Sequence, residues 1–164
     1  MKKIALLLAS VLILAGCSAK PAVETADLWV KSSEMSMVGG MTAIYGTLTN
    51  TTGSDITLTG ATTEVAGLVE IHEVAMVDGE MKMQEIDGGL VIPAGQSVIL
   101  EPGGNHIMLM ELTAAIEAGQ EISVTLNFDG ADSLALTGIV AKPSEGGDEE
   151  YHQHEEGEDH DHDH

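Results

Sequence analysis

The stretch HIMLMEL, residues 106–112, is the most legible β-strand in the sequence and indicates how the rest of the chain folds. Successive side chains of a strand point to opposite faces, so His106, Met108 and Met110 share one face. Ile107 and Leu109 lie on the other face and are the natural core residues. We therefore expect this strand to bury an aliphatic face and to present imidazole and thioether groups on the opposite one.

The stretch EMKMQ, residues 80–84, shows the same two-residue period. Its polar residues alternate with Met81 and Met83, so both thioethers point the same way. Met81 and Met110 each lie two residues from another methionine, and either packing or metal binding would explain them.

The remaining strand signals are short runs of β-branched and apolar residues, separated by Gly, Asn, Asp and Pro. They are Thr42–Thr49, Ile56–Thr59, Leu68–Met76, Gln96–Leu100, Glu121–Phe128 and Ser133–Ala141. Several short strands at this spacing predict an all-β fold, an antiparallel sandwich or barrel. Only Thr113–Ala118 resembles a helical turn.

The two ends of the chain differ from this core in composition. Lys2 and Lys3, the apolar run Ile4–Leu14 and the sequence Leu-Ala-Gly-Cys ending at Cys17 are typical of a signal peptide over residues 1–16. The last four of these residues resemble the lipobox of bacterial lipoproteins, which predicts an exported protein with a lipid anchor on Cys17. We expect a lipidated tether over residues 17–25, one domain over residues 26–142 and a tail over residues 143–164.

Cysteine content and charge exclude several functions. Cys17 is the only cysteine, so the domain has no disulfide, no CxxC pair and no thiolate for a blue-copper centre. From Cys17 onwards the chain keeps four lysines, no arginine and all 27 acidic residues, a formal charge of −23. This charge disfavours nucleic acid and anionic lipid headgroups, and it attracts cations.

Methionine and histidine carry the functional signal. Eight methionines remain after Met1, and the domain has two histidines. His72 is followed by ten residues and Met83, then by twenty-two residues and His106-Ile107-Met108. This spacing resembles the periplasmic copper chaperone family PCu(A)C, in which the second spacer is about one residue shorter. Gly88-Gly89 lies within this spacer and could absorb the extra residue in a turn. The similarity also includes Val69–Glu73, Ile92–Gly95 and Pro102–Met110, and it extends from about Trp29 to Ala141.

The resemblance implies a cupredoxin-like β-sandwich that binds Cu(I) through His72, Met83, His106 and Met108. It also implies delivery of copper to an acceptor, such as the CuA site of cytochrome c oxidase subunit II. Thioether and imidazole suit a soft monovalent ion, and thioethers need no deprotonation. Met35, Met37 and Met41 would form either a second soft site or ordinary loop packing.

The tail has ten acidic residues, five histidines and no lysine, and it is too polar to fold by itself. We expect it to be disordered and to buffer Cu(II) or Zn(II), or merely to keep the protein soluble. Its candidate ligands are His152, His154, His160, His162 and His164.

No nucleophile–base pair or phosphate loop is recognisable, so we expect no enzyme. Copper sequestration for tolerance and an exported copper enzyme are the alternatives to delivery. We expect the anchored protein on the outer face of the cytoplasmic membrane or in the periplasm and outer membrane.

Overall fold

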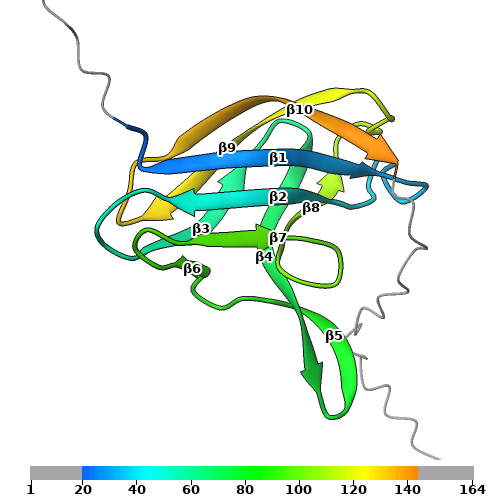
Figure 1. Ribbon diagram of the computed structural model, residues 1–164. Coiled ribbons are helices and arrows are strands. Elements are labelled where there is room, and N and C mark those ends of the chain that lie inside the picture. The colour runs from blue at the N-terminus through cyan, green and yellow to red at the C-terminus, as the bar shows by residue number, and fades with distance from the viewer. Residues whose placement is uncertain (1–19, 144–164) are drawn as a thin grey trace, which may run out of the picture.

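The computed structural model describes residues 20–143, which form ten β-strands (Figure 1). The strands are β1 (Val23–Ser32), β2 (Thr42–Asn50), β3 (Ile56–Thr62), β4 (Ala66–Val77), β5 (Glu80–Glu85), β6 (Leu90–Ile92), β7 (Ser97–Leu100), β8 (His106–Leu112), β9 (Glu121–Asp129) and β10 (Leu134–Pro143). Within these residues no helix is long and apolar enough to cross a membrane. The predicted all-β class is confirmed.

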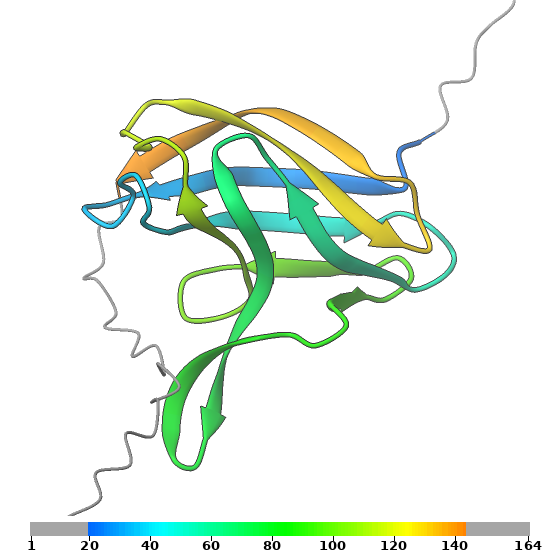
Figure 2. The same cartoon turned by 180° about the vertical axis from the view of Figure 1, so that it is seen from behind.

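The strands follow one hydrogen-bonded path, β5-β4-β8-β2-β1-β10-β9-β3-β6, and β7 pairs separately with β2. This path folds over itself, so that β9 and β3 cross the strands β2 and β8 from the other side of the core (Figure 2). The result is the expected β-sandwich. One pair differs from the antiparallel expectation, because β1 and β10 run parallel.

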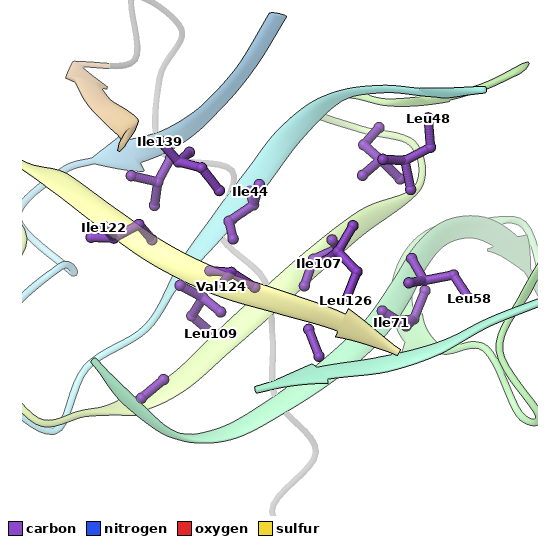
Figure 3. Close-up of a cluster of buried hydrophobic side chains, with 14 of the residues drawn as sticks. Ile44, Leu48, Leu58, Ile71, Ile107, Leu109, Ile122, Val124, Leu126 and Ile139 are labelled. Atoms are coloured by element: carbon purple, nitrogen blue, oxygen red, sulfur yellow. The ribbon is translucent and has the colours of Figure 1, made fainter. Parts of the chain in front are cut away.

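Aliphatic side chains fill the space between the two layers. Figure 3 shows Ile122, Val124 and Leu126 of β9 lying across residues of β2 and β8. Ile107 and Leu109 are fully buried here, as the alternation along residues 106–112 predicts. Burial of such side chains contributes roughly 1.5–3 kcal/mol each, so this layer supplies most of the driving force for folding.

The first strand begins at Val23, inside the segment expected to be a tether, so the folded domain starts earlier than residue 26. The prediction of a helical turn at Thr113–Ala118 is wrong. There, the backbone N–H of Ile116 donates to the carbonyl of Ser36 at 2.9 Å, and the Ser32 hydroxyl donates to the carbonyl of Ile116 at 3.1 Å. The backbone N–H and carbonyl of Ile116 are therefore bonded to another segment of the chain, whereas in a helix they would bond to residues nearby in the sequence.

Two turns position the strands that carry the methionines. Asp78 and Gly79, both with positive φ, join β4 to β5 in a two-residue hairpin. Gly88 and Gly89 also have positive φ and follow β5, in the spacer where an extra residue was expected to be absorbed. A Cβ on Gly89 would lie 2.3 Å from the carbonyl oxygen of Leu58, so no other residue fits this turn without movement.

The hairpin of β4 and β5 extends beyond the rest of the sandwich (Figures 1 and 2). β4 pairs with β8 from Ala66 to His72, and from His72 onwards its partner is β5. We call residues 73–84 the β4–β5 ribbon. The predicted signal peptide, Cys17 and residues 144–164 of the predicted tail lie outside the described residues. Pro143, expected to begin the tail, is instead the last residue of β10.

Candidate metal centre

The two histidines of the domain lie side by side on the outer face of the sheet. His72 of β4 and His106 of β8 are direct partners in the antiparallel ladder. Their ring centroids are 5.7 Å apart and their planes are inclined by 69°. The neighbouring pair, Ile71 and Ile107, points to the opposite face and is buried in the core. The register that builds the core therefore also brings the imidazoles together.

The hydrogen bonds of His106 define which ring nitrogen can bind a metal. Its Nδ1 lies 3.0 Å from the carbonyl oxygen of Gly104. A carbonyl oxygen only accepts, so Nδ1 carries the proton and donates it. In the neutral ring Nε2 then holds a lone pair, and it lies 3.2 Å from the sulfur of Met83. A nitrogen and a sulfur lone pair thus face one another, as two ligands of one ion would.

His72 is oriented by a carboxylate. Its Nε2 lies 2.8 Å from Oε2 of Glu70, two residues earlier on the same face of β4. The carboxylate accepts, so Nε2 donates and the lone pair of the neutral ring is on Nδ1. Nδ1 is buried and has no hydrogen-bond partner within residues 20–143. A buried polar atom without a partner is costly, and a metal ion would satisfy it. Carboxylates commonly orient metal-binding histidines in this way.

The two predicted thioether ligands come from different strands. Met108 lies two residues after His106 on β8 and is 5% exposed. It forms a small cluster with Ala43 and Tyr45 of β2, and half-buried Met83 packs against this cluster from β5. The structure therefore brings all four predicted ligand residues to one region of the outer face. Three strands contribute them, namely β4, β5 and β8.

Aromatic side chains form one wall of this region. The Trp29 and Tyr45 rings are 4.9 Å apart, and the Tyr45 and His106 rings are 6.2 Å apart. His106 is 3% exposed beside these rings. Two imidazole nitrogens and two thioethers form a soft donor set, which suits Cu(I) and offers little to hard cations. Residues 20–143 contain no group of three or more His, Cys, Asp or Glu side chains that could hold a metal ion.

The other methionines divide into two groups. Met110 and Met41 are half-buried and pack against the same cluster, so Met41 joins the site region. Met81 lies on the site face, as expected from the alternation, but it is 58% exposed on the β4–β5 ribbon. Met35 and Met37 are exposed in the loop between β1 and β2. The tail histidines lie outside the described residues.

Glu70, Trp29 and Tyr45 were missed by the sequence analysis. A signal existed for Glu70, because its position two residues before His72 places both side chains on one face of a strand. Trp29 and Tyr45 reach the site through the pairing of β1 with β2 and of β2 with β8. No local pattern reveals that pairing.

Comparison with known proteins places the chain among lipoproteins. The sequence model of the LpqE-like lipoprotein family matches residues 23–140. Lxx21020 of Leifsonia xyli subsp. xyli, which is also named as a lipoprotein, is 42% identical over 130 residues, 79% of this chain and 75% of that protein. RP573 of Rickettsia prowazekii is 33% identical over 87 residues, 53% of this chain and 48% of that protein.

Solved structures share the fold. The solution structure of Cu(I)-bound DR1885 from Deinococcus radiodurans is 27% identical, with a TM-score of 0.56 over 79% of this chain and 82% of that one. The apo PCuAC domain from PmoF1 and the copper-bound PCuAC domain from PmoF2 each match 74% of this chain with a TM-score of 0.59. The match covers 95% of the PmoF1 domain and 94% of the PmoF2 domain. Their identities, 19% and 17%, support the fold alone.

Proposed function

The chain belongs to the LpqE-like lipoprotein family, and we propose that it is an extracytoplasmic chaperone that binds Cu(I) and delivers it to an acceptor protein. This proposal is supported by the fold, which resembles that of solved PCuAC domains, and by the 27% identity to DR1885, whose solved structure is Cu(I)-bound. In this proposal His72, Met83, His106 and Met108 are the copper ligands.

One observation supports this assignment above the others. Each histidine has one ring nitrogen engaged by an oxygen acceptor and the other nitrogen left with a lone pair. The lone pair on Nδ1 of His72 is buried and has no hydrogen-bond partner among the residues that the structure describes, and the one on Nε2 of His106 faces the Met83 sulfur at 3.2 Å. Ordinary packing does not explain a buried nitrogen without a partner, whereas a bound ion does.

The donor set favours carriage over redox catalysis. Cu(I) accepts thioether and imidazole without octahedral geometry, whereas Cu(II) prefers nitrogen and oxygen. Three of the four proposed ligands are nearly buried, and Met83 is half-buried on β5. An acceptor can therefore replace Met83 first and the buried ligands afterwards. Stepwise ligand exchange of this kind moves the ion without releasing it to water, and it requires no catalytic group.

Delivery to the CuA site of cytochrome c oxidase subunit II is the specific form of this proposal. A lipid anchor at Cys17 would hold the carrier at a membrane surface, on the outer face of the cytoplasmic membrane or in the periplasm and outer membrane. The second candidate function is copper sequestration for tolerance, favoured by the five histidines of the tail, which would add Cu(II) or Zn(II) capacity.

Metal titration tests the site. The full mature chain and a variant with its five tail histidines changed to asparagine should each bind one Cu(I) at the domain. Binding should be lost in Met83→Ala and in His106→Ala and retained in Met37→Ala, which removes an exposed thioether from the β1–β2 loop. Equal Cu(I) affinity in His106→Ala and the unmodified protein would exclude this site.

Gene deletion separates delivery from tolerance. A delivery defect should lower oxidase assembly at limiting copper and be relieved by added copper. A tolerance defect should instead raise sensitivity to excess copper and leave oxidase assembly intact.

A further inference from the structure

Two methionines on the β4–β5 ribbon are unusually exposed. Met76 and Met81 are direct partners in the ladder between β4 and β5, and they are 65% and 58% exposed. Both thioethers are therefore presented to solvent from the same place. Exposed apolar pairs on a projecting hairpin favour aggregation, so their presence calls for a function.

The hairpin turn determines how close these two side chains come. Val77 and Glu80 flank the two-residue turn and form the first, hydrogen-bonded pair. Pairs alternate along an antiparallel ladder, so Met76 and Met81 form a non-hydrogen-bonded pair, the type with the closer side chains. The Cβ atoms of such a pair are about 4.5–5.5 Å apart. Two flexible thioethers at this separation can reach a common ion.

The methionine pair, Met76 and Met81, lies on the same face as the candidate metal centre. The next pair on this face is Val74 with Met83, and the pair after it is His72 with Glu85. Each step of two residues along a strand covers about 6.6 Å. The methionine pair is thus one step outward from Met83, and Met83 is in contact with His106.

The opposite face of the ribbon has a different character. There Gln84 donates a hydrogen bond to Glu73 at 3.0 Å, and Lys82 lies 4.0 Å from Glu80. The ribbon is therefore two-sided, with a charged face and a soft face of Val74, Met76, Met81 and Met83. The soft face continues directly into the candidate metal centre.

We propose that Met76 and Met81 form an outer Cu(I) subsite, through which the ion passes on its way to or from Met83. This inference rests on the proposed Cu(I) function. The ion only exchanges ligands at each step: a thioether–copper bond forms as another is released, and no electron is transferred. Two neutral thioethers bind Cu(I) weakly enough for the subsite to be occupied transiently.

The experiment compares two double variants of the full mature chain. Met76→Leu/Met81→Leu removes the outer subsite, and Met35→Leu/Met37→Leu removes two thioethers of similar exposure from the β1–β2 loop. That loop is bonded to Leu112, at the opposite end of β8 from His106. Leucine preserves apolar volume, and circular dichroism verifies the fold. The measurements are the equilibrium Cu(I) affinity and the rate of transfer to excess bicinchoninate.

We expect Met76→Leu/Met81→Leu to keep the equilibrium affinity and to slow transfer about tenfold, which corresponds to an activation free energy of transfer raised by about 1.4 kcal/mol. The loop variant should match the unmodified protein. Titration with Ag(I) beyond one equivalent should shift the methyl NMR signals of Met76 and Met81 before those of Met35 and Met37.

Equal transfer rates in the two double variants would overturn the subsite. So would slower transfer to a protein acceptor combined with unchanged transfer to bicinchoninate, since that result marks a docking surface for the acceptor. If the unmodified chain binds no Cu(I) at all, the proposed function fails, and the subsite fails with it. Normal Cu(I) binding with no effect of Met76→Leu/Met81→Leu refutes the subsite alone.

Discussion

The contact between Glu70 and His72 predicts that Glu70 orients the imidazole ring for metal binding. Oε2 of Glu70 accepts the Nε2 proton of His72 at 2.8 Å, and the side chains of His72 and Glu70 are 10% and 25% exposed. The carboxylate keeps the proton on Nε2 and the lone pair on Nδ1, and it holds the ring in place. Glu70→Ala removes this acceptor without removing a proposed ligand. We therefore expect Cu(I) to bind more weakly and to remain at the same site.

The size of the effect follows from the geometry. Loss of a group that orients a metal-binding histidine typically lowers metal affinity about 10- to 100-fold. Glu70 is one quarter exposed, so water can partly replace it, and the lower end of that range applies. We expect Glu70→Ala to weaken Cu(I) binding about tenfold, or about 1.4 kcal/mol. Glu70→Gln retains a carbonyl acceptor and should lose less.

The assay is anaerobic competition for Cu(I) with bicinchoninate, with Glu73→Ala as the matched control. Glu73 carries the same charge on the same strand, but it lies on the opposite face and bonds to Gln84. Equal affinities for Glu70→Ala and Glu73→Ala would refute the orienting role. Long-range proton–nitrogen NMR offers an independent check, since a proton on Nδ1 of His72 in the metal-free protein would contradict the same reasoning.

Three further predictions follow from the packing, and a fourth follows from metal binding. Met108→Leu should lower the free energy of unfolding, measured in urea, by less than about 1.5 kcal/mol, and it should weaken Cu(I) binding. Met108→Ala should lower the free energy of unfolding by about 2–5 kcal/mol, because the Met108 side chain is only 5% exposed. Ile107→Ala should cost a similar 2–5 kcal/mol by the same assay. Gly89→Ala should lower the free energy of unfolding by more than about 1 kcal/mol, because φ at residue 89 is +92° and the new Cβ would meet the backbone of Leu58. An unchanged midpoint of urea unfolding would contradict this prediction. Cu(I) at 100 times its Kd should stabilise the protein by about 2.7 kcal/mol, with no effect in His106→Ala.

The fold was predictable wherever the two-residue period is intact. The strand expected over residues 106–112 coincides with β8, and Ile107 and Leu109 are buried as expected. β1 was missed because a bulge between Ala26 and Trp29, with Asp27 at a φ of 53°, interrupts the alternation along that strand. β6 has three residues, which is too short to show a period. The parallel pairing of β1 with β10 joins segments more than 100 residues apart and leaves no local pattern.

The structure brings the four predicted ligand residues to one region, but the sequence did not show how they are arranged there. The resemblance in spacing to the PCu(A)C family implied His72, Met83, His106 and Met108 as ligands, and alternation placed Met108 on the same face as His106. The direct pairing of His72 with His106 depends on the register between β4 and β8, which the alternation within either strand does not specify. The role of Glu70 depends on a side-chain rotamer, and so does the choice of ring nitrogen. These details arise only once the strands have been brought together.

The register between β4 and β8 couples the candidate metal centre to the stability of the fold. A shift of one residue would turn His106 and Met108 into the core and expose Ile107 and Leu109, so hydrophobic burial strongly disfavours it. The core thus holds His72 opposite His106 before any ion arrives, and copper need not order these two side chains. Met83 is different, because β5 is paired with β4 alone along residues 80–85. The histidines are therefore prearranged by the core, and Met83 lies on the strand whose position the core constrains least. This division suits a carrier that must hold an ion firmly and still release it to a partner.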